Sequence, residues 1–303
     1  MIRSLYSAIS GLKNHQVKMD VIGNNIANVN TTGFKRSRVT FATTLSQTLK
    51  GASSPIPTAP PTTTGGTNPM QVGLGAMLSS IDQIMTTGSA QTTGNPTDMM
   101  IQGSGFFILD NSGQTVYSRA GAFSLDSAGN LVDPGSGALV QGQAYVGDAT
   151  PLVWTNPTSN VVIDIGGFAF NSATDPGTPP YGTLTSYSID QSGIVSGVYT
   201  DAAGGSTIHK IAQIAIANFP NAPGLENLGG NFYGETNNSG TIDVGAAGTN
   251  GRGKIIPNTV EMSNVDLSTE FTDMIVAQRG FQANSRVITV SDTLLEELIN
   301  LKR

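Results

Sequence analysis

The sequence predicts an α+β protein, mainly β, with a discontinuous layout: two terminal α-helices that pair like a coiled coil, and a central β domain of barrel or sandwich type. Two observations predict this fold. At both ends of the chain, apolar residues recur at alternating spacings of three and four, the pattern of a helix with one apolar seam. Between the ends, short apolar runs are separated by turns rich in Gly, Asn and Ser.

The first apolar seam opens the chain. One polar residue, Gln16, and one glycine, Gly23, interrupt it. An asparagine cluster followed by Gly33 then favours a helix end and a turn. The seam residues that we expect to form an assembly interface are Ile2, Leu5, Ile9, Leu12, Met19 and Ile26.

The second apolar seam closes the chain. Asp266 is a candidate N-cap for this helix, and Glu270 and Asp273 lie near its start, where the helix dipole favours acids. We expect residues 1–30 and 266–303 to form one helical assembly domain. The seam residues expected to contribute to its interface are Phe271, Met274, Phe281, Ile288, Leu295 and Leu298.

The charge balance differs between the two ends. The first fifty residues carry seven Lys and Arg against one acid, Asp20, whereas acids outnumber cations in the last forty-odd residues. Opposite balances favour pairing of the two helices with each other. Because an exposed ion pair contributes only ~0–1 kcal/mol, we expect charge to set partner and register, and apolar burial to supply the strength.

The middle of the chain reads as strands and turns. We expect a β domain over 71–235, with connecting segments at 31–70 and 236–265. Residues 51–69 are rich in Pro and Thr and read as a linker or a long exposed loop. Two runs within 103–120, joined by Asn-Ser-Gly, predict a hairpin, and 209–219 is a strong strand candidate.

The composition offers little for catalysis. The chain has no cysteine, which excludes thiolate chemistry, and its two histidines, His15 and His209, lie far apart in sequence. Most acids sit in turns, such as those at Asp110 and Asp126, where backbone hydrogen bonding explains them. The net charge of −6 argues against nucleic-acid binding. We therefore expect no catalytic, cofactor or metal site, and no small-molecule ligand.

Targeting signals are also missing from the pattern. The chain opens directly on an amphipathic pattern, without the apolar core of a cleavable signal peptide. No window approaches the length of a membrane-spanning apolar segment. These observations suggest either a cytoplasmic protein or one that leaves the cell through an export apparatus that cleaves no signal.

Three blocks of sequence resemble, in the same order, those of the bacterial flagellar rod and hook axial proteins. The first is Asn-Asn-Ile-Ala-Asn-Val-Asn-Thr-Thr-Gly-Phe-Lys over 24–35, the second lies within 102–123, and the third includes Asn-Val-Asp-Leu-Ser from 264 and Gln-Arg-Gly-Phe-Gln-Ala-Asn-Ser-Arg over 278–286. The residues that carry this signature are Asn24, Asn25, Ala27, Asn28, Gly33, Phe34, Asn264, Arg279 and Asn284.

Within this family the last block is most similar to hook proteins, although the chain length is closer to that of a rod protein. The resemblance implies a structural subunit that polymerises into the flexible tubular hook, with the distal rod as the alternative. It also implies export without a cleaved signal, a location outside the cell in the flagellum, and no enzymatic activity. The implied partners are other copies of the chain, the export apparatus, and the hook-cap, distal-rod and hook–filament junction proteins.

A remote alternative comes from another class of protein. The Gly- and Thr-rich β region would also suit a secreted module that binds or cleaves carbohydrate. Saccharide binding by the region 71–235 would distinguish this alternative.

Overall fold

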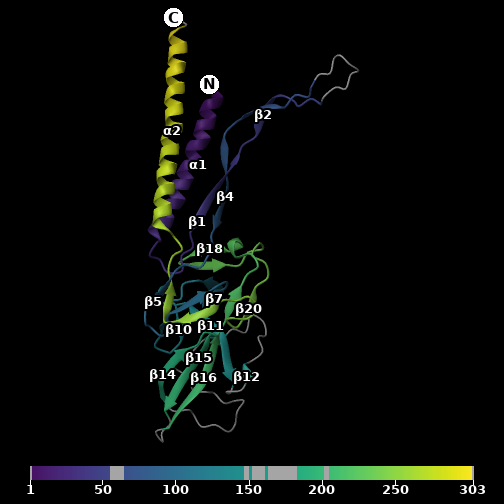
Figure 1. The fold of residues 1–303 in the computed structure, drawn as a ribbon. Coiled ribbons are helices and arrows are strands. Elements are labelled where there is room, and N and C mark those ends of the chain that lie inside the picture. Colours follow the sequence, from purple (N-terminus) through teal and green to yellow (C-terminus); the bar gives the residue numbers. More distant parts are fainter. Residues whose placement is uncertain are drawn as a thin grey trace. The chain divides into compact units, whose positions relative to one another are not determined.

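The computed structural model describes residues 2–54, 65–146, 150–151, 161–162, 183–200 and 205–301. The chain forms two compact units (Figure 1), each built from separate stretches of sequence. The first unit comprises Met1–Ala27, Ser37–Gln83 and Asp266–Arg303, and the second comprises Asn28–Arg36 and Ile84–Val265. The structure thus groups most of 31–70 with the helices and 236–265 with the strands, while the domain division expected from the sequence stays a prediction.

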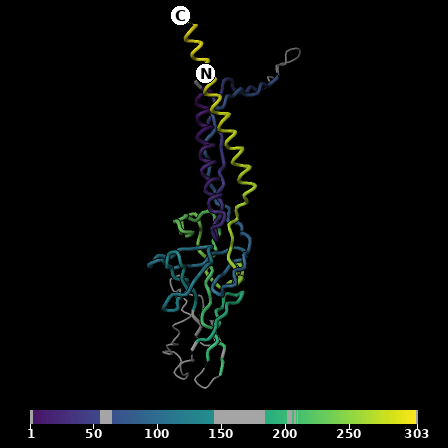
Figure 2. Tube along the Cα trace, turned by 90° about the vertical axis from the view of Figure 1, so that its left-hand side faces the viewer, coloured from purple at the N-terminus to yellow at the C-terminus, as the bar shows by residue number. Residues whose placement is uncertain are grey.

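The first unit is built around two helices. Helix α1 (Ile2–Ala27) and helix α2 (Leu267–Asn300) run antiparallel and lie side by side in two perpendicular views (Figures 1 and 2). Asp266 caps α2, since its carboxylate accepts a hydrogen bond from the backbone N–H of Ser268 at 3.0 Å. The terminal helices and this cap are confirmed.

Two antiparallel ribbons complete the first unit. Strand β1 (Ser37–Thr43) pairs with β4 (Ala76–Gln83), and both pack against α1. Strand β2 (Ser46–Lys50) pairs with β3 (Met70–Gly73), and a bridge between Ser53 and Thr67 extends this pairing. The described ends of the expected 51–69 loop therefore continue a ribbon, and residues 55–64 lie outside the described residues.

In its described residues the second unit consists of strands and the short 3-10 helix η2 (Ala222–Gly224). Its largest sheet has the strand order β14-β15-β16-β11-β7-β8-β19-β18, and six short strands pair beside this path. The strands on the path are β7 (Phe106–Asn111), β8 (Gln114–Ser118), β11 (Leu139–Val146), β14 (Thr183–Ile189), β15 (Ile194–Thr200), β16 (Ser206–Ile214), β18 (Glu226–Gly229) and β19 (Phe232–Gly234).

The remaining strands are short. Those beside the main path are β9 (Ser124–Leu125), β10 (Leu131–Val132), β12 (Thr150–Pro151), β13 (Val161–Val162), β17 (Ile216–Asn218) and β20 (Asp243–Gly245). Two further pairs join distant stretches of sequence: β5 (Ala90–Thr92) with β22 (Thr259–Glu261), and β6 (Met99–Gln102) with β21 (Lys254–Pro257).

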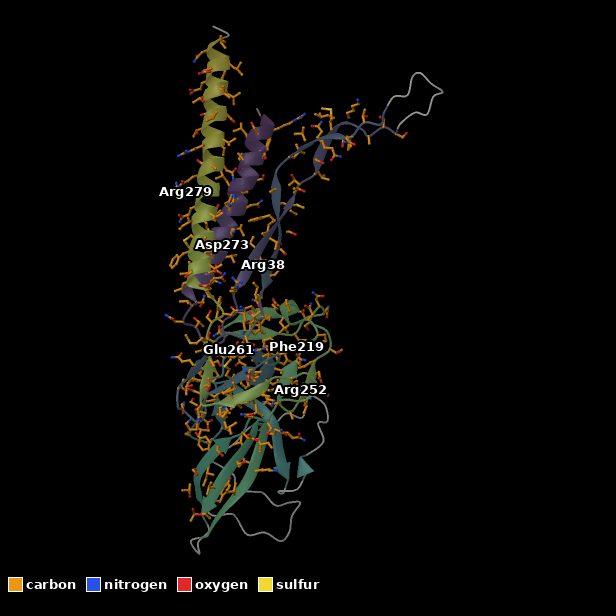
Figure 3. All side chains as sticks on the ribbon, in the orientation of Figure 1. Arg38, Phe219, Arg252, Glu261, Asp273 and Arg279 are labelled. Atoms are coloured by element: carbon orange, nitrogen blue, oxygen red, sulfur yellow. The ribbon has the colours of Figure 1, made fainter. Side chains whose placement is uncertain are left out.

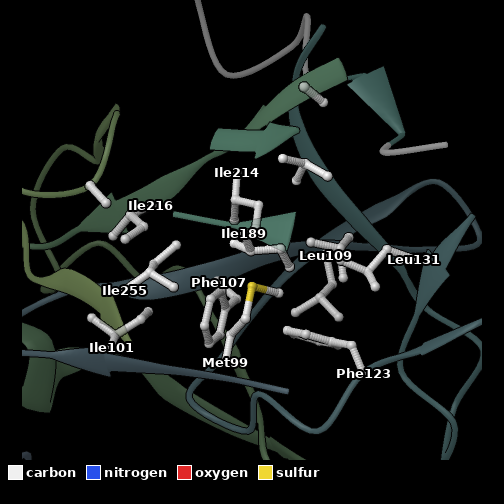
Figure 4. Close-up of a cluster of buried hydrophobic side chains, with 14 of the residues drawn as sticks. Met99, Ile101, Phe107, Leu109, Phe123, Leu131, Ile189, Ile214, Ile216 and Ile255 are labelled. Atoms are coloured by element: carbon white, nitrogen blue, oxygen red, sulfur yellow. The ribbon is translucent and has the colours of Figure 1, made fainter. Parts of the chain in front are cut away.

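Strand β7 lies at the centre of the second unit, because both of its faces are buried. Phe107 and Leu109 point into one apolar cluster, which also holds Met99 and Leu131 (Figure 4). Phe106 and Ile108 point into a second cluster on the opposite face. A strand covered on both faces reads as an apolar run without alternation, which is what Phe-Phe-Ile-Leu is.

The predicted hairpin is confirmed as β7 and β8, with Ser112 and Gly113 at its turn. Both residues have positive φ, 54° and 89°, as a two-residue turn between antiparallel strands requires. The Asp110 carboxylate accepts a hydrogen bond from the Gly113 N–H at 2.7 Å. The strand expected over 209–219 is also found, as β16 and β17 with Ala215 between them.

The mainly β class with terminal helices is confirmed. Of the two forms expected for the β domain, barrel and sandwich, the barrel is not found. The described strands do not close into a barrel, since the main path ends at β14 on one side and at β18 on the other. Twisted open sheets cover their faces with side chains from loops and short strands, as the two clusters around β7 do.

Two buried tyrosines predict loss of stability at alkaline pH. Burial raises the pKa of Tyr233 to about 12, and burial with the negative charge of Glu235 raises the pKa of Tyr117 to about 12. In the unfolded chain a tyrosine titrates near about 10. The native state therefore binds more protons above this pH, so we expect the free energy of unfolding to fall as the pH rises from about 10 to about 12.

The test measures this free energy by urea denaturation across that pH range. Tyr233→Phe should make the alkaline fall shallower, whereas Tyr6→Phe, at an exposed position on α1, should leave it unchanged. An equal fall in all three proteins would contradict the assignment.

Candidate assembly interface

The fully buried residues of α1 and α2 are mostly small or polar. Only one large apolar side chain, Ile22, is fully buried in the described parts of the two helices. The other buried residues on the helices are Ala8, Asn14, Asn25, Glu270, Ala277 and Ser291. The described large apolar residues of the two helices are otherwise half-buried or exposed, so a single chain removes only part of their apolar surface from water.

Polar contacts give the pairing of α1 and α2 its specificity. Asn25 donates a hydrogen bond to the Glu270 carboxylate at 3.2 Å, and Lys18 forms an ion pair with Asp273 at 3.0 Å. Asn25 also holds the start of β1, donating to the Ser37 carbonyl and accepting from the Ser37 N–H. This gives a physical role to a signature asparagine that the sequence singled out.

Two buried polar atoms of α1 have no hydrogen-bond partner in the part of the chain that the structure describes. They are Nδ2 of Asn14 and Nδ1 of His15. A buried polar group without a partner costs about 1–3 kcal/mol. The helix pair of a single chain is therefore weakly held.

The apolar residues of α2 lie mainly on its outside. Five of them, together with the C-cap residue Leu301, are spaced by 11, 3, 4, 4 and 3 residues, which places them in one stripe along the helix. Between 43% and 81% of each is exposed. We call this set the outer stripe: Val276, Val287, Val290, Leu294, Leu298 and Leu301.

The outer stripe continues past the N-terminal end of α1. The last turns of α2 extend beyond that end in both views (Figures 1 and 2). Within its own unit the stripe therefore lacks a helix to cover it near Leu298 and Leu301. An exposed apolar surface of this kind marks a protein–protein contact site.

The residues expected in the assembly interface divide between the two faces of the helices. Half-buried positions are Leu5, Leu12, Met19, Ile26, Met274, Ile288 and Leu295. Exposed positions are Ile9, Phe271, Phe281 and Leu298. Ile2 begins α1, and its side chain lies outside the described residues. Their contact with other copies stays a prediction.

Sequence reasoning missed most of the outer stripe. It followed one seam through Met274, Ile288 and Leu295, which is the face turned toward α1. Val287, Val290 and Leu294 form a second series at the same spacings. That second series was the available signal, since a helix with two apolar series has more than one partner.

In the second unit, one carboxylate joins three distant stretches of sequence. Glu261 of β22 accepts hydrogen bonds from Lys35, from Arg119 at 3.3 Å, and from the Gly88 N–H at 2.8 Å. All three charged side chains are at most 3% exposed. Burial lowers the pKa of Lys35 and of Arg119, although the negative charge of Glu261 opposes both shifts.

Three signature residues support this cluster. Gly33 has φ of +69°, and a Cβ atom there would lie 2.5 Å from the Ala120 nitrogen, so glycine is required. The side chain of Asn264 accepts from the Arg36 N–H at 2.8 Å and donates to the Ile84 carbonyl at 2.7 Å, while its N–H donates to the Phe34 carbonyl. Residues 28–36 and the segment before α2 are therefore held side by side.

The other signature residues lie on or beside the helices. Asn28 accepts a hydrogen bond from the Thr31 hydroxyl at 3.1 Å in the turn after α1. Asn24, Ala27 and Arg279 are exposed, and Asn284 is half-buried against Gly11. Figure 3 shows Glu261 on the β unit and Asp273 and Arg279 on α2. The sequence had not singled out Lys35, Arg119 or Glu261 as a set.

Within the described residues, no helix is long and apolar enough to cross a membrane.

These features define a structural subunit with an outward apolar helix face, and comparison with known proteins gives its family. Three family models match: "Flagella basal body rod protein" over 5–35, "Flagellar hook protein FlgE/F/G D1 domain" over 100–197, and "Flagellar basal body rod FlgEFG protein C-terminal" over 256–301. The chain belongs to the flagellar rod and hook protein family.

Three relatives align along their whole length with the whole of this chain, or nearly so. The flagellar basal-body rod protein FlgG of Bacillus subtilis is 45% identical over 304 residues. The flagellar hook protein FlgE of Borreliella burgdorferi is 32% identical over 450 residues, with all of both chains covered. The FlgG of the same Borreliella is 34% identical over 306 residues, with all of both chains covered.

Membership of this family fixes the class of function. Its proteins are structural components of the flagellum and are not enzymes. They assemble with themselves into flagellar polymers, and the chain is a component of the extracellular flagellar structure formed by basal body and hook. The carbohydrate-active alternative is thereby set aside.

The buried ion cluster predicts that replacing the Glu261 carboxylate by an amide strongly lowers the free energy of unfolding. Glu261→Gln would leave two buried cations without a counter-charge, so we expect the free energy of unfolding to fall by about 3–5 kcal/mol. Asp82→Asn is the control, because Asp82 pairs with Arg38 on an exposed ribbon at 3.5 Å and should contribute about 0–1 kcal/mol. Denaturant titration measures both, and equal small losses would contradict the cluster's role.

The outer stripe predicts a defect in assembly without a defect in folding. Leu294→Asn with Leu298→Asn removes apolar surface that the single chain leaves exposed, so helix content and stability should change little while polymers are lost. Thr289→Asn places the same amide at an exposed position of α2 outside the stripe and should assemble normally. Circular dichroism and electron microscopy measure the two properties, and normal polymers from the double variant would refute the stripe's role.

Proposed function

We propose that the chain is the subunit of the flagellar hook, the tubular joint between rod and filament. The observation that carries this proposal is the number of residues identical to a hook protein. In the Borreliella FlgE, 32% of 450 aligned positions is about 144 identical residues. In the Borreliella FlgG, 34% of 306 is about 104. A single organism thus supplies both relatives, and its hook protein shares more positions with this chain.

The difference in length accounts for the lower percentage. The alignment with the Borreliella hook protein has 450 positions, whereas this chain has 303 residues, so at least 147 positions oppose no residue of this chain. These positions lower the percentage without lowering the likeness elsewhere. We infer that this chain is a minimal hook subunit without the additional segment.

The second candidate is the distal rod subunit. It is favoured by the FlgG of Bacillus subtilis, which has the highest percentage of the three relatives and aligns without a large insertion. The outer stripe and helix pair serve either function, because each is a tube of the same kind of subunit. An experiment in cells is therefore needed to distinguish a hook subunit from a rod subunit.

The proposed mechanism of assembly follows from the first unit. A weakly held helix pair carries an apolar stripe that a single chain leaves exposed. Neighbouring copies cover this stripe with a different surface of their own, so the contact is head-to-tail; because it does not close on itself, it repeats and generates a helical polymer. Export without a cleaved signal, and growth between rod, hook cap and hook–filament junction proteins, belong to the same proposal.

A deletion strain tests the proposal. We expect cells that lack this chain to keep an intact rod and to lose the hook and the filament beyond it. Electron microscopy of isolated basal bodies measures this, and expression of the chain from a plasmid should restore the hook. A truncated rod in the deletion strain would favour the distal rod instead.

A further inference from the structure

Two glycines on facing helices each receive a large side chain from the other helix. A Cβ atom at Gly11 of α1 would lie 2.6 Å from Nδ2 of Asn284 on α2. A Cβ atom at Gly280 of α2 would lie 2.6 Å from the His15 ring on α1. Each helix thus has one glycine, which leaves a notch in its surface, and one large side chain, which fills the notch of the other helix. The two pairs lie about one turn apart.

Glycine at these positions has to be explained, because it is the least favourable residue in a helix interior apart from proline. Gly23 on the same helix provides the contrast, since a Cβ atom there would meet nothing within 4 Å. Open space leaves the identity of residue 23 free, whereas Gly11 and Gly280 are filled by their partners. The His15 ring also contacts the Phe41 ring in a T-shaped arrangement, with 6.4 Å between the ring centroids.

The notches belong to a longer series of matched positions. Asn25 meets Glu270 in the same antiparallel register in which His15 meets Gly280 and Gly11 meets Asn284, because the residue numbers in each pair add up to 295. Each contact is short-ranged and specific in shape or charge. A shift by one turn would place Asn284 or His15 against a residue that has a Cβ atom.

This inference rests on assembly, which places every helix among apolar faces of other copies. Apolar contact alone does not distinguish one register of α1 and α2 from another, since apolar residues recur along both helices. We propose that the Gly11–Asn284 and His15–Gly280 pairs are the specificity determinants that set the one register in which α1 and α2 of a chain pair. The outer stripe is thereby kept for neighbouring copies.

An exchange of residues tests the proposal in full-length chains expressed in cells that lack the natural protein. Gly11→Asn sets two amides against each other, and Asn284→Gly leaves a void. We expect each to reduce the number of assembled tubes per cell by at least about tenfold, the effect of about 1.4 kcal/mol. The double variant G11N/N284G refills the same space from the other helix and should restore tubes. Gly23→Asn is the matched control and should assemble normally.

Mixing distinguishes pairing within a chain from pairing between chains. Cells that express G11N and N284G on separate chains should remain without tubes, because no single chain has a matched pair. Failure of the double variant to restore tubes, or restoration by the mixture, would overturn the proposal. Any tube counts in this test, whether hook or rod, so its outcome is independent of the deletion strain that tests the proposed function.

Discussion

The structure depends on where the apolar residues of α2 are placed. Its side toward α1 carries Ala277, Gly280 and Asn284, and its outer stripe carries valines and leucines. The hydrophobic effect scales with the apolar area removed from water, so most of the free energy that these helices can release becomes available only when copies meet. A weakly paired helix pair in the single chain and an apolar contact between copies are two consequences of one arrangement.

In the second unit, a buried cluster of charged side chains joins distant parts of the chain. Lys35, Arg119 and Glu261 come from the beginning, middle and end of the chain, and they meet where water is excluded. A buried ion cluster adds little stability compared with apolar residues of the same size, but it tolerates few alternative arrangements. Together with Gly33 and Asn264, it fixes the two stretches through which the chain passes between its units. The well-defined contacts of the ion cluster thus contrast with the weakly held pair of α1 and α2.

The sequence predicted the elements better than the contacts. Terminal helices, the Asp266 cap and the β7–β8 hairpin follow from local patterns, because spacing, capping and turn chemistry act within a few residues. The notches at Gly11 and Gly280 and the partners of Glu261 join residues more than a hundred positions apart. A local sequence pattern does not predict contacts between residues so far apart in the chain. The second apolar series on α2 was visible in the spacing, but it was hidden by the assumption that one helix has one partner.

The hydrogen bond between Asn25 and Glu270 spans 245 positions of the chain. When a polypeptide emerges gradually, from a ribosome or from any narrow passage, α1 emerges before the strands and α2 emerges after them. The strands between them have their own partners and can fold in the interval. Because α2 carries the outer stripe, this apolar surface becomes available only after α1 and the strands have emerged. The order of the elements along the chain therefore determines when the surface for assembly becomes available.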